Sequence, residues 1–232
     1  GETTVASVTK GLLTINGGEF RANDSEYGST YLINCYDANY KDGAAKVAIS
    51  GGTFYGFNPE NNAAEGAGTD FCPEGYTVVY NAVEDSYTVI SAVAKIGETY
   101  YATLSSAISA VKNGETIEFI ADINENVTIK QAANKSFTID GAGKTYSATI
   151  SIDGNKRSTG KETLRIENVN FVAERELQTS IDAIKSTFVH NVTVDNCTFT
   201  GKDKKQYGMI LRNSYNISVM NTKAENVLEL VY

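Results

Sequence analysis

The sequence predicts an all-β fold: a right-handed parallel β-helix with a short capping α-helix at about residues 103–113, preceded by a smaller β unit. The main observation is a motif of apolar, polar, apolar and polar residues closed by Gly or Asn, which occurs at 137–141, 164–168, 192–196 and 217–221. The copies start 25 to 28 residues apart, and further short apolar runs such as 127–129 and 149–152 lie between them. A short fixed period indicates units that stack on their neighbours.

Each copy of the motif has the pattern of a strand that ends in a corner. Alternate side chains of a strand point to opposite faces, so the apolar positions enter a shared core. Gly and Asn adopt the left-handed backbone of a sharp corner at low cost. We expect one interior column, formed by Ile139, Ile166, Val194 and Val219. The asparagines are expected to shape corners, alone or as a side-chain ladder: Asn168, Asn196 and Asn221.

The best helix signal lies just before the first strand of the repeat, which we expect at 116–120. Thr103 is a suitable N-cap, and an apolar face follows at helical spacing, made of Leu104, Ala107, Ile108 and Val111. Asn113 and Gly114 are expected to end the helix. A one-faced helix here shields the first turn of a β-helix from water.

The first part of the chain contains a repeat of its own. The pattern of residues 14–20 recurs at 48–54, and each copy has a glycine corner followed by an aromatic residue. We expect another strand at 31–36, a polar loop at 37–43 and a long loop at 58–75. Runs 77–80 and 87–90 predict a hairpin, and a second hairpin is expected to turn at 97–98. The predicted domains are a β-rich unit at 1–91 and a β-helix at 92–232 that continues beyond residue 232.

Composition excludes several classes of partner. The 232 residues carry a net charge of −8, which repels nucleic acid, and no apolar run reaches the length of a membrane span. The first residues lack the features of a signal peptide, so we expect a mature form or a piece of a longer protein. Three cysteines are too few for a disulfide framework or a metal motif, although a Cys35–Cys72 disulfide is one alternative.

Two runs resemble a known family. The run 95–117 is similar to the segment that opens the right-handed, pectin-lyase-like β-helix modules of secreted and cell-surface bacterial proteins, which also occur in phage tail proteins, and the run 51–59 is similar to one that closes them. The resemblance implies a β-helix and an extracellular or cell-surface location. It leaves the activity open, because this fold hosts lyases, hydrolases, adhesins and spacers.

The residues that enzymes of this fold need are scarce. His190, the only histidine, stands in an ordinary strand entry, and paired-aspartate motifs are absent. We therefore expect no catalytic residue and no cofactor. Asp140, Glu167 and Asp195 fall one per turn on the outward side of the repeat. Because such turns stack about 4.8 Å apart, we expect a cation such as Arg165 to compensate these charges, calcium to bind them, or the side chains to splay into solvent.

Aromatic residues point to binding instead. The chain has 14 tyrosines and 9 phenylalanines without tryptophan, and tyrosine combines an apolar face with a polar tip. Candidates for a sugar platform are Tyr36, Tyr40, Tyr55 and Phe57, with Tyr27 and Tyr31 nearby in sequence. The alternative is that these rings cover the ends of turns or stack inside.

Together these features predict a non-catalytic extracellular β-helix module of a bacterial surface protein, acting as an adhesive or stalk segment that binds carbohydrate or a host surface. The alternatives are a phage tail-spike or fibre segment and a polysaccharide lyase or hydrolase. We expect self-association through open coil ends, no nucleic-acid partner and no membrane insertion.

Overall fold

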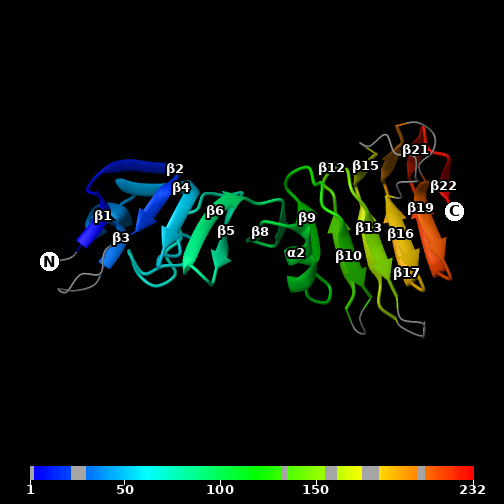
Figure 1. Cartoon of the computed structure of the whole chain (residues 1–232), viewed down its shortest axis with the longest axis horizontal. Helices are drawn as coiled ribbons and strands as arrows, with labels where there is room; N and C mark the ends of the chain where they lie inside the picture. Colours follow the sequence, from blue (N-terminus) through cyan, green and yellow to red (C-terminus); the bar gives the residue numbers. More distant parts are fainter. Residues whose placement is uncertain (1–2, 22–29, 132–134, 155–160, 174–182, 203–206) are drawn as a thin grey trace. The chain divides into compact units, whose positions relative to one another are not determined.

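A computed structural model describes residues 3–21, 30–131, 135–154, 161–173, 183–202 and 207–232 (Figure 1). The chain forms two compact units, Gly1–Ala92 (unit 1) and Val93–Tyr232 (unit 2). Both are built mainly from strands, many of them in parallel sheets. The predicted all-β class is confirmed.

In the described residues of unit 2 there is one helix, α2 (Leu104–Ala110), and two strands precede it, β7 (Ala94–Ile96) and β8 (Thr99–Tyr101). The strands that follow are β9 (Thr116–Phe119), β10 (Val127–Lys130), β11 (Phe137–Asp140), β12 (Thr145–Tyr146), β13 (Ile150–Asp153), β14 (Leu164–Glu167), β15 (Asn170–Val172), β16 (Ile184–Thr187), β17 (His190–Asp195), β18 (Thr198–Thr200), β19 (Tyr207–Arg212), β20 (Tyr215–Met220), β21 (Lys223–Glu225) and β22 (Glu229–Val231).

These strands build three sheets, and from β10 onward each sheet takes every third strand of the chain. The orders are β10-β13-β16-β19-β22, β12-β15-β18-β21 and β20-β17-β14-β11-β9-β7-β8. Figure 1 shows β10, β13, β16 and β19 side by side. One turn of chain, here called a rung, therefore adds one strand to each sheet. Rung-to-rung pairing is parallel throughout, whereas β7 pairs antiparallel with both β8 and β9, as expected for a hairpin turning at 97–98.

The repeated motif forms β11, β14, β17 and β20, which pair without slippage. Ile139 pairs with Ile166, which pairs with Val194, and Val194 pairs with Val219. Ile139 and Ile166 are completely buried. The predicted interior column is confirmed, and only its last member, Val219, is partly exposed.

A second column is aromatic and runs along the sheet of β12, β15 and β18. Phe171 stacks on Phe199 with ring centroids 4.7 Å apart, and Tyr146 meets Phe171 edge-on at 5.8 Å. Burial raises the pKa of the Tyr146 phenol, whose hydroxyl donates to the backbone carbonyl of Glu125. The hydroxyl group of Tyr146 is thus hydrogen-bonded although its ring lies in an apolar core.

Helix α2 covers the start of this core, with Leu104 and Ala107 completely buried. Thr103 is the N-cap as predicted, and its hydroxyl accepts from the backbone N–H of Ser106 at 3.1 Å. The helix ends at Ala110, short of the predicted boundary, because Val111 turns to an extended backbone with ψ 135°. The left-handed residue Gly114, at φ +84°, lies beyond this end.

Unit 1 is smaller and mixes parallel with antiparallel pairing. Its elements are β1 (Thr3–Val8), β2 (Gly11–Arg21), β3 (Thr30–Cys35), α1 (Asp37–Lys41), β4 (Ala45–Tyr55), β5 (Tyr76–Asn81) and β6 (Ser86–Ser91). Strand β1 pairs with β3, and the order of the other sheet is β2-β4-β6-β5. The predicted β5–β6 hairpin is confirmed.

One prediction for unit 1 is wrong, because the polar run 37–43 begins with a helix, α1, instead of forming only a loop. Asp37 lies in the first turn and Lys41 in the last, which suits the helix dipole at both ends. The backbone N–H of Tyr40 also bonds to the carbonyl of Tyr36 at 3.0 Å. The sequence did not predict this short helix because a polar run is typical of a loop.

The two copies of the glycine corner in unit 1 lie on neighbouring strands. Phe20 of β2 pairs with Phe54 of β4, and their rings stack at 4.8 Å. A Cβ atom on Gly51 would lie 2.3 Å from the carbonyl oxygen of Asn16, whereas nothing lies within 4 Å of the corresponding point on Gly17. Of these two glycines, only Gly51 is closely approached by the backbone of a neighbouring strand.

This difference gives a matched pair of variants. Gly51→Ala should lower the free energy of unfolding by about 1–3 kcal/mol, because backbone must shift to admit the methyl group. Gly17→Ala should change it by less than about 0.5 kcal/mol. Urea unfolding followed by circular dichroism measures both, and equal effects at the two positions would contradict the close approach.

Candidate functional site

The outward face of the sheet that contains β11, β14 and β17 carries a column of acidic side chains. Asp140 pairs with Glu167, and Glu167 pairs with Asp195. Glu118 of β9 pairs with Asp140 and extends the column by one rung. The structure therefore brings together the three acidic residues that the sequence singled out, on successive rungs.

Arg165 forms ion pairs with two members of this column. Its Nε donates to Glu167 Oε2 on its own strand, and its Nη2 donates to Asp195 Oδ2 on the next rung. The side chain of Asp195 is 15% exposed and that of Glu167 is 25% exposed. Of the three expected outcomes, compensation by a cation is the one that the structure shows for this pair.

The asparagine corners contribute further hydrogen bonds. Asn168 and Asn196 have left-handed backbones, at φ +56° and +49°. Asn196 Nδ2 donates to Asn168 Oδ1 at 2.7 Å, and Asn168 Nδ2 donates to Asp140 Oδ1 at 2.9 Å. The expected ladder therefore forms over two rungs and ends on a carboxylate.

The third asparagine departs from that ladder. Asn221 Nδ2 donates to Asp195 Oδ1 at 2.8 Å instead of bonding to Asn196. This hydrogen bond is the main cause that lowers the pKa of the Asp195 carboxyl, and the bond from Arg165 adds to it. The carboxylate is thus held in its charged form by partners on two other rungs.

A shallow polar hollow lies beside these corners. Its lining consists of Asp140, Ala142, Gly143, Asn168, Asn170, Asn196 and Thr198. The Thr198 hydroxyl donates to Asn170 Oδ1 at 2.9 Å, and Asn170 Nδ2 donates to the carbonyl of Gly143. Amides, hydroxyls and a carboxylate offer a ligand both donors and acceptors.

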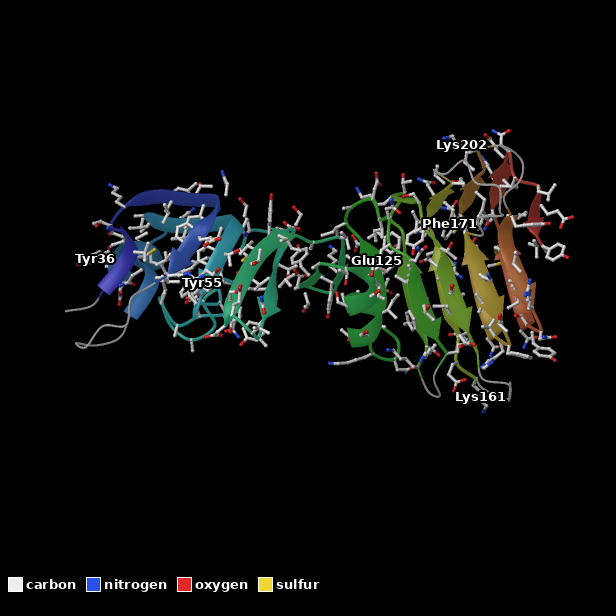
Figure 2. All side chains as sticks on the ribbon, in the orientation of Figure 1. Tyr36, Tyr55, Glu125, Lys161, Phe171 and Lys202 are labelled. Atoms are coloured by element: carbon white, nitrogen blue, oxygen red, sulfur yellow. The ribbon has the colours of Figure 1, made fainter. Side chains whose placement is uncertain are left out.

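The aromatic candidates of unit 1 occupy different environments. Tyr36 is 60% exposed, whereas Phe57 is 8% exposed and belongs to the core. Tyr40 packs edge-on against Phe71 at 6.3 Å, and Tyr55 is covered by the guanidinium of Arg21, 3.2 Å from the ring centroid. Figure 2 labels Tyr36 and Tyr55. Among these four, Tyr36 is the residue with a freely exposed ring.

Two further candidates from the sequence cannot be placed. Tyr27 and the side chain of Tyr31 lie outside the described residues. Phe57 offers no ring face to a ligand, because its side chain completes a cluster with Phe54 and Phe71.

His190 has a partner that sequence reasoning missed. Its Nε2 lies 3.1 Å from Glu162 Oε2, and both side chains are about nine-tenths buried. The side-chain amide of Gln131 bonds to both the N–H and the carbonyl of His190, across 59 residues. No local signal marks this contact, since Gln131 reaches the rung after next. The arrangement fastens the backbone of His190 to the residue that follows β10.

The three cysteines are free thiols in this structure. Burial raises the pKa of Cys35 to about 11, of Cys72 to about 12 and of Cys197 to about 11. Since the thiolate is the reactive form, these side chains are poor nucleophiles at neutral pH.

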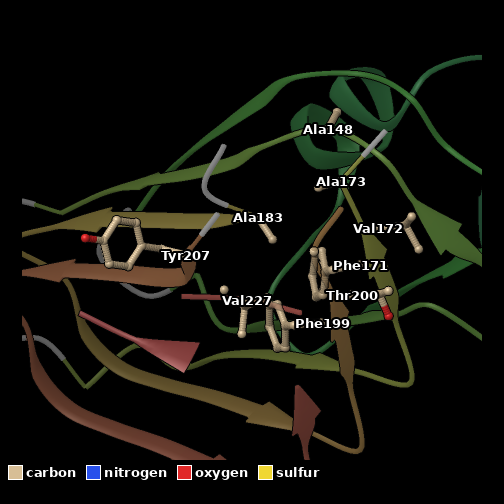
Figure 3. Close-up of a pocket in the computed structure, with 11 residues that line it drawn as sticks. Ala148, Phe171, Val172, Ala173, Ala183, Phe199, Thr200, Tyr207 and Val227 are labelled. Carbon is tan, nitrogen blue, oxygen red and sulfur yellow. The ribbon is translucent and has the colours of Figure 1, made fainter. Parts of the chain in front are cut away.

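A smaller, apolar hollow lies among the ends of β15, β18 and β19, with Phe171, Phe199 and Val227 among its lining residues (Figure 3). Small side chains such as Ala148 and Ala183 leave this space. It lacks the convergent polar groups that orient a specific ligand.

Across the described ranges, no three side chains of the His, Cys, Asp or Glu type come together in a way that would hold a metal ion. Neither helix in the described part of the chain has the length and apolar character that a membrane crossing requires.

The role of Asn221 can be tested at the Asp195 carboxyl. Asn221→Gly keeps the left-handed backbone but removes the donor, so the pKa of Asp195 should rise toward its ordinary value. A carboxyl whose pKa is lowered by folding stabilises the folded state at pH values above its ordinary pKa. This stabilisation is lost as the pH falls through the pKa of the folded state, so the variant should lose part of this pH dependence. Carbon-detected NMR titration gives the pKa. Asn226→Gly, at a similar left-handed position, is the control, and an unchanged Asp195 would contradict the assignment.

The thiols give a second test. At pH 7.5 iodoacetamide should label Cys35 and Cys197 roughly 100-fold, and Cys72 roughly 1,000-fold, more slowly in the native protein than in the urea-unfolded chain, because the thiolate fraction falls with the raised pKa. Mass spectrometry of the labelled peptides reports each cysteine separately. A cysteine that reacts equally fast in both states would be contrary to its burial.

No protein-family model, curated protein or solved structure matches this chain in the comparisons made with each.

Proposed function

We propose that unit 2 is a right-handed parallel β-helix and that the chain is a non-catalytic adhesive or stalk module of a bacterial surface protein. The observation that carries the proposal is the strand order, in which each rung adds one strand to each of three parallel sheets. The right-handed sense follows the strong preference of parallel crossovers for that hand.

Mechanical stiffness supports the stalk role. Every rung from β11 to β20 pairs in register with the next, and the interior columns of Ile139 and of Phe171 run along the stack. A chain in which each rung contacts only the rungs before and after it behaves as a quasi-one-dimensional rod. Such a rod presents its outer faces at fixed spacing.

The pairing of the acidic groups favours a non-catalytic role. Hydrolases and lyases require a carboxylate or base that is free to take a proton from substrate. Here Arg165 and Asn221 hold Asp195 in its charged form, and Asn168 donates a hydrogen bond to Asp140. These partners suit a permanent polar surface better than a proton-transfer site.

Glycan binding is proposed for the polar hollow beside the asparagine corners. Asn168, Asn170 and Thr198 offer planar amides and a hydroxyl, the groups that best match the paired donors and acceptors of sugar hydroxyls. The exposed ring of Tyr36 in unit 1 is a separate candidate contact. The cell-surface location rests on the resemblance of the run 95–117 to secreted modules.

The test is to incubate the protein with bacterial, plant and mucin polysaccharides, and to measure retention on the glycan together with release of new chain ends. We expect retention without cleavage. Asn196→Gly removes an amide of the hollow, keeps the left-handed corner and should weaken retention about 2- to 10-fold. Asn226→Gly is the matched control and should bind as the unaltered protein does.

Each outcome decides between functions. Release of chain ends would overturn the non-catalytic proposal and favour a polysaccharide lyase or hydrolase. Absence of both retention and cleavage would remove the adhesive role and leave the stalk. Retention that is insensitive to Asn196→Gly but lost in Tyr36→Ala would move the glycan site to unit 1.

A further inference from the structure

Asp140 differs from the other acidic residues of the outward column, because no cation pairs with it within the described part of the chain. Arg165 on the next rung forms its ion pairs with Glu167 and Asp195 instead. The position on β11 that pairs with Arg165 is Thr138, which is uncharged. Since Asp140 is part of the lining of the polar hollow, the hollow contains a carboxylate whose charge is left for a ligand.

The carboxylate of Asp140 also fixes which way the asparagine ladder points. An ionised carboxylate only accepts hydrogen bonds, so Asn168 must turn its Nδ2 toward Asp140, at 2.9 Å. The Oδ1 of Asn168 then faces the next rung and accepts from Asn196 Nδ2 at 2.7 Å. This leaves Asn196 Oδ1 as an acceptor to which none of the described residues donates. The ladder thus presents an oxygen atom at each of its ends.

The side-chain groups that remain available in the hollow are mainly acceptors. Asp140 Oδ1 accepts from the backbone N–H of Ala142 at 2.8 Å and from Asn168, whereas its Oδ2 bonds to none of the described residues. The amide nitrogens of Asn168, Asn170 and Asn196 each already donate within the protein. Among the described residues that line the hollow, none is lysine, arginine or histidine. A ligand group that suits this lining is therefore rich in donors and positively charged.

We infer, on the basis of the glycan role proposed above for the hollow, that its ligand is a polysaccharide with free amino groups, one of which binds the Asp140 carboxylate as an ammonium. A primary ammonium offers three donors and no acceptor. Its charge strengthens the hydrogen bond to a carboxylate, whereas an N-acetylated amino sugar is neutral and an acidic sugar is repelled. The net charge of −8 on the chain opposes acidic glycans in the same way.

Two matched oligosaccharides test this specificity: the hexamer of glucosamine, and the hexamer of N-acetylglucosamine, which lacks the charge. At about pH 5.5 the amines of the first hexamer are protonated. Isothermal titration calorimetry should show that the glucosamine hexamer binds about 3- to 10-fold more tightly. Added sodium chloride should weaken binding of the charged hexamer and leave that of the neutral hexamer nearly unchanged, because salt screens exposed ion pairs.

Asp140→Asn removes the charge but keeps the Oδ1 acceptor that holds Asn168 and the Ala142 N–H. The variant should reduce the preference for the glucosamine hexamer to less than about twofold. Asp153→Asn, at an exposed position of β13 in a different sheet, removes the same charge and is the matched control. It should bind both hexamers as the unaltered protein does.

The outcomes separate this inference from the proposed glycan role. Equal binding of the two hexamers, or a preference that survives Asp140→Asn, would overturn the amino-sugar ligand and leave the glycan role in place. A preference lost equally in Asp153→Asn would also overturn it, because the overall negative charge would then be the cause. If neither hexamer nor any polysaccharide of the wider panel is retained, the glycan role fails and the amino-sugar ligand fails with it.

Discussion

Parallel pairing between successive rungs is the interaction on which the rest of unit 2 depends. Each strand of the repeated motif exchanges backbone hydrogen bonds with the strands before and after it, so that Leu164 lies between Phe137 and Val192. A slip by one residue would turn Ile166 outward and drive Arg165 into the core. The alternation of apolar and polar residues therefore sets the register, and the register places every other side chain.

The register of the strands also fixes where the polar residues of the corners lie on the surface. Asn168, Asn196 and Asn221 close their strands in left-handed backbone, and their amides reach a neighbouring rung. A residue chosen for its backbone freedom thus also provides a hydrogen bond at the same place on each turn. Gly141, at the first of these corners, lacks the amide because a Cβ there would lie 2.6 Å from the carbonyl of Asn168.

In the acidic column, the stacking of rungs brings like charges close together and also brings the groups that compensate them. Asp140, Glu167 and Asp195 lie on successive rungs in one column only because the strands pair in register. The same pairing brings Arg165 between Glu167 and Asp195, and it brings Asn168 beside Asp140. Charge compensation comes from the chain itself, which favours a surface that is polar and permanently charged.

The sequence by itself determined the all-β class, the interior column of Ile139, the capped helix after Thr103 and the asparagine corners, because alternation, helical spacing and left-handed propensity are local properties. It listed compensation by Arg165 among three outcomes for the acidic column but did not choose between them. Only the tertiary structure decided that choice, the pairing of His190 with Glu162, the burial of Phe57 and the helix at 37–41. Most of these depend on contacts between residues far apart in the chain, which a local pattern does not encode, and the short helix was hidden by a polar run typical of loops.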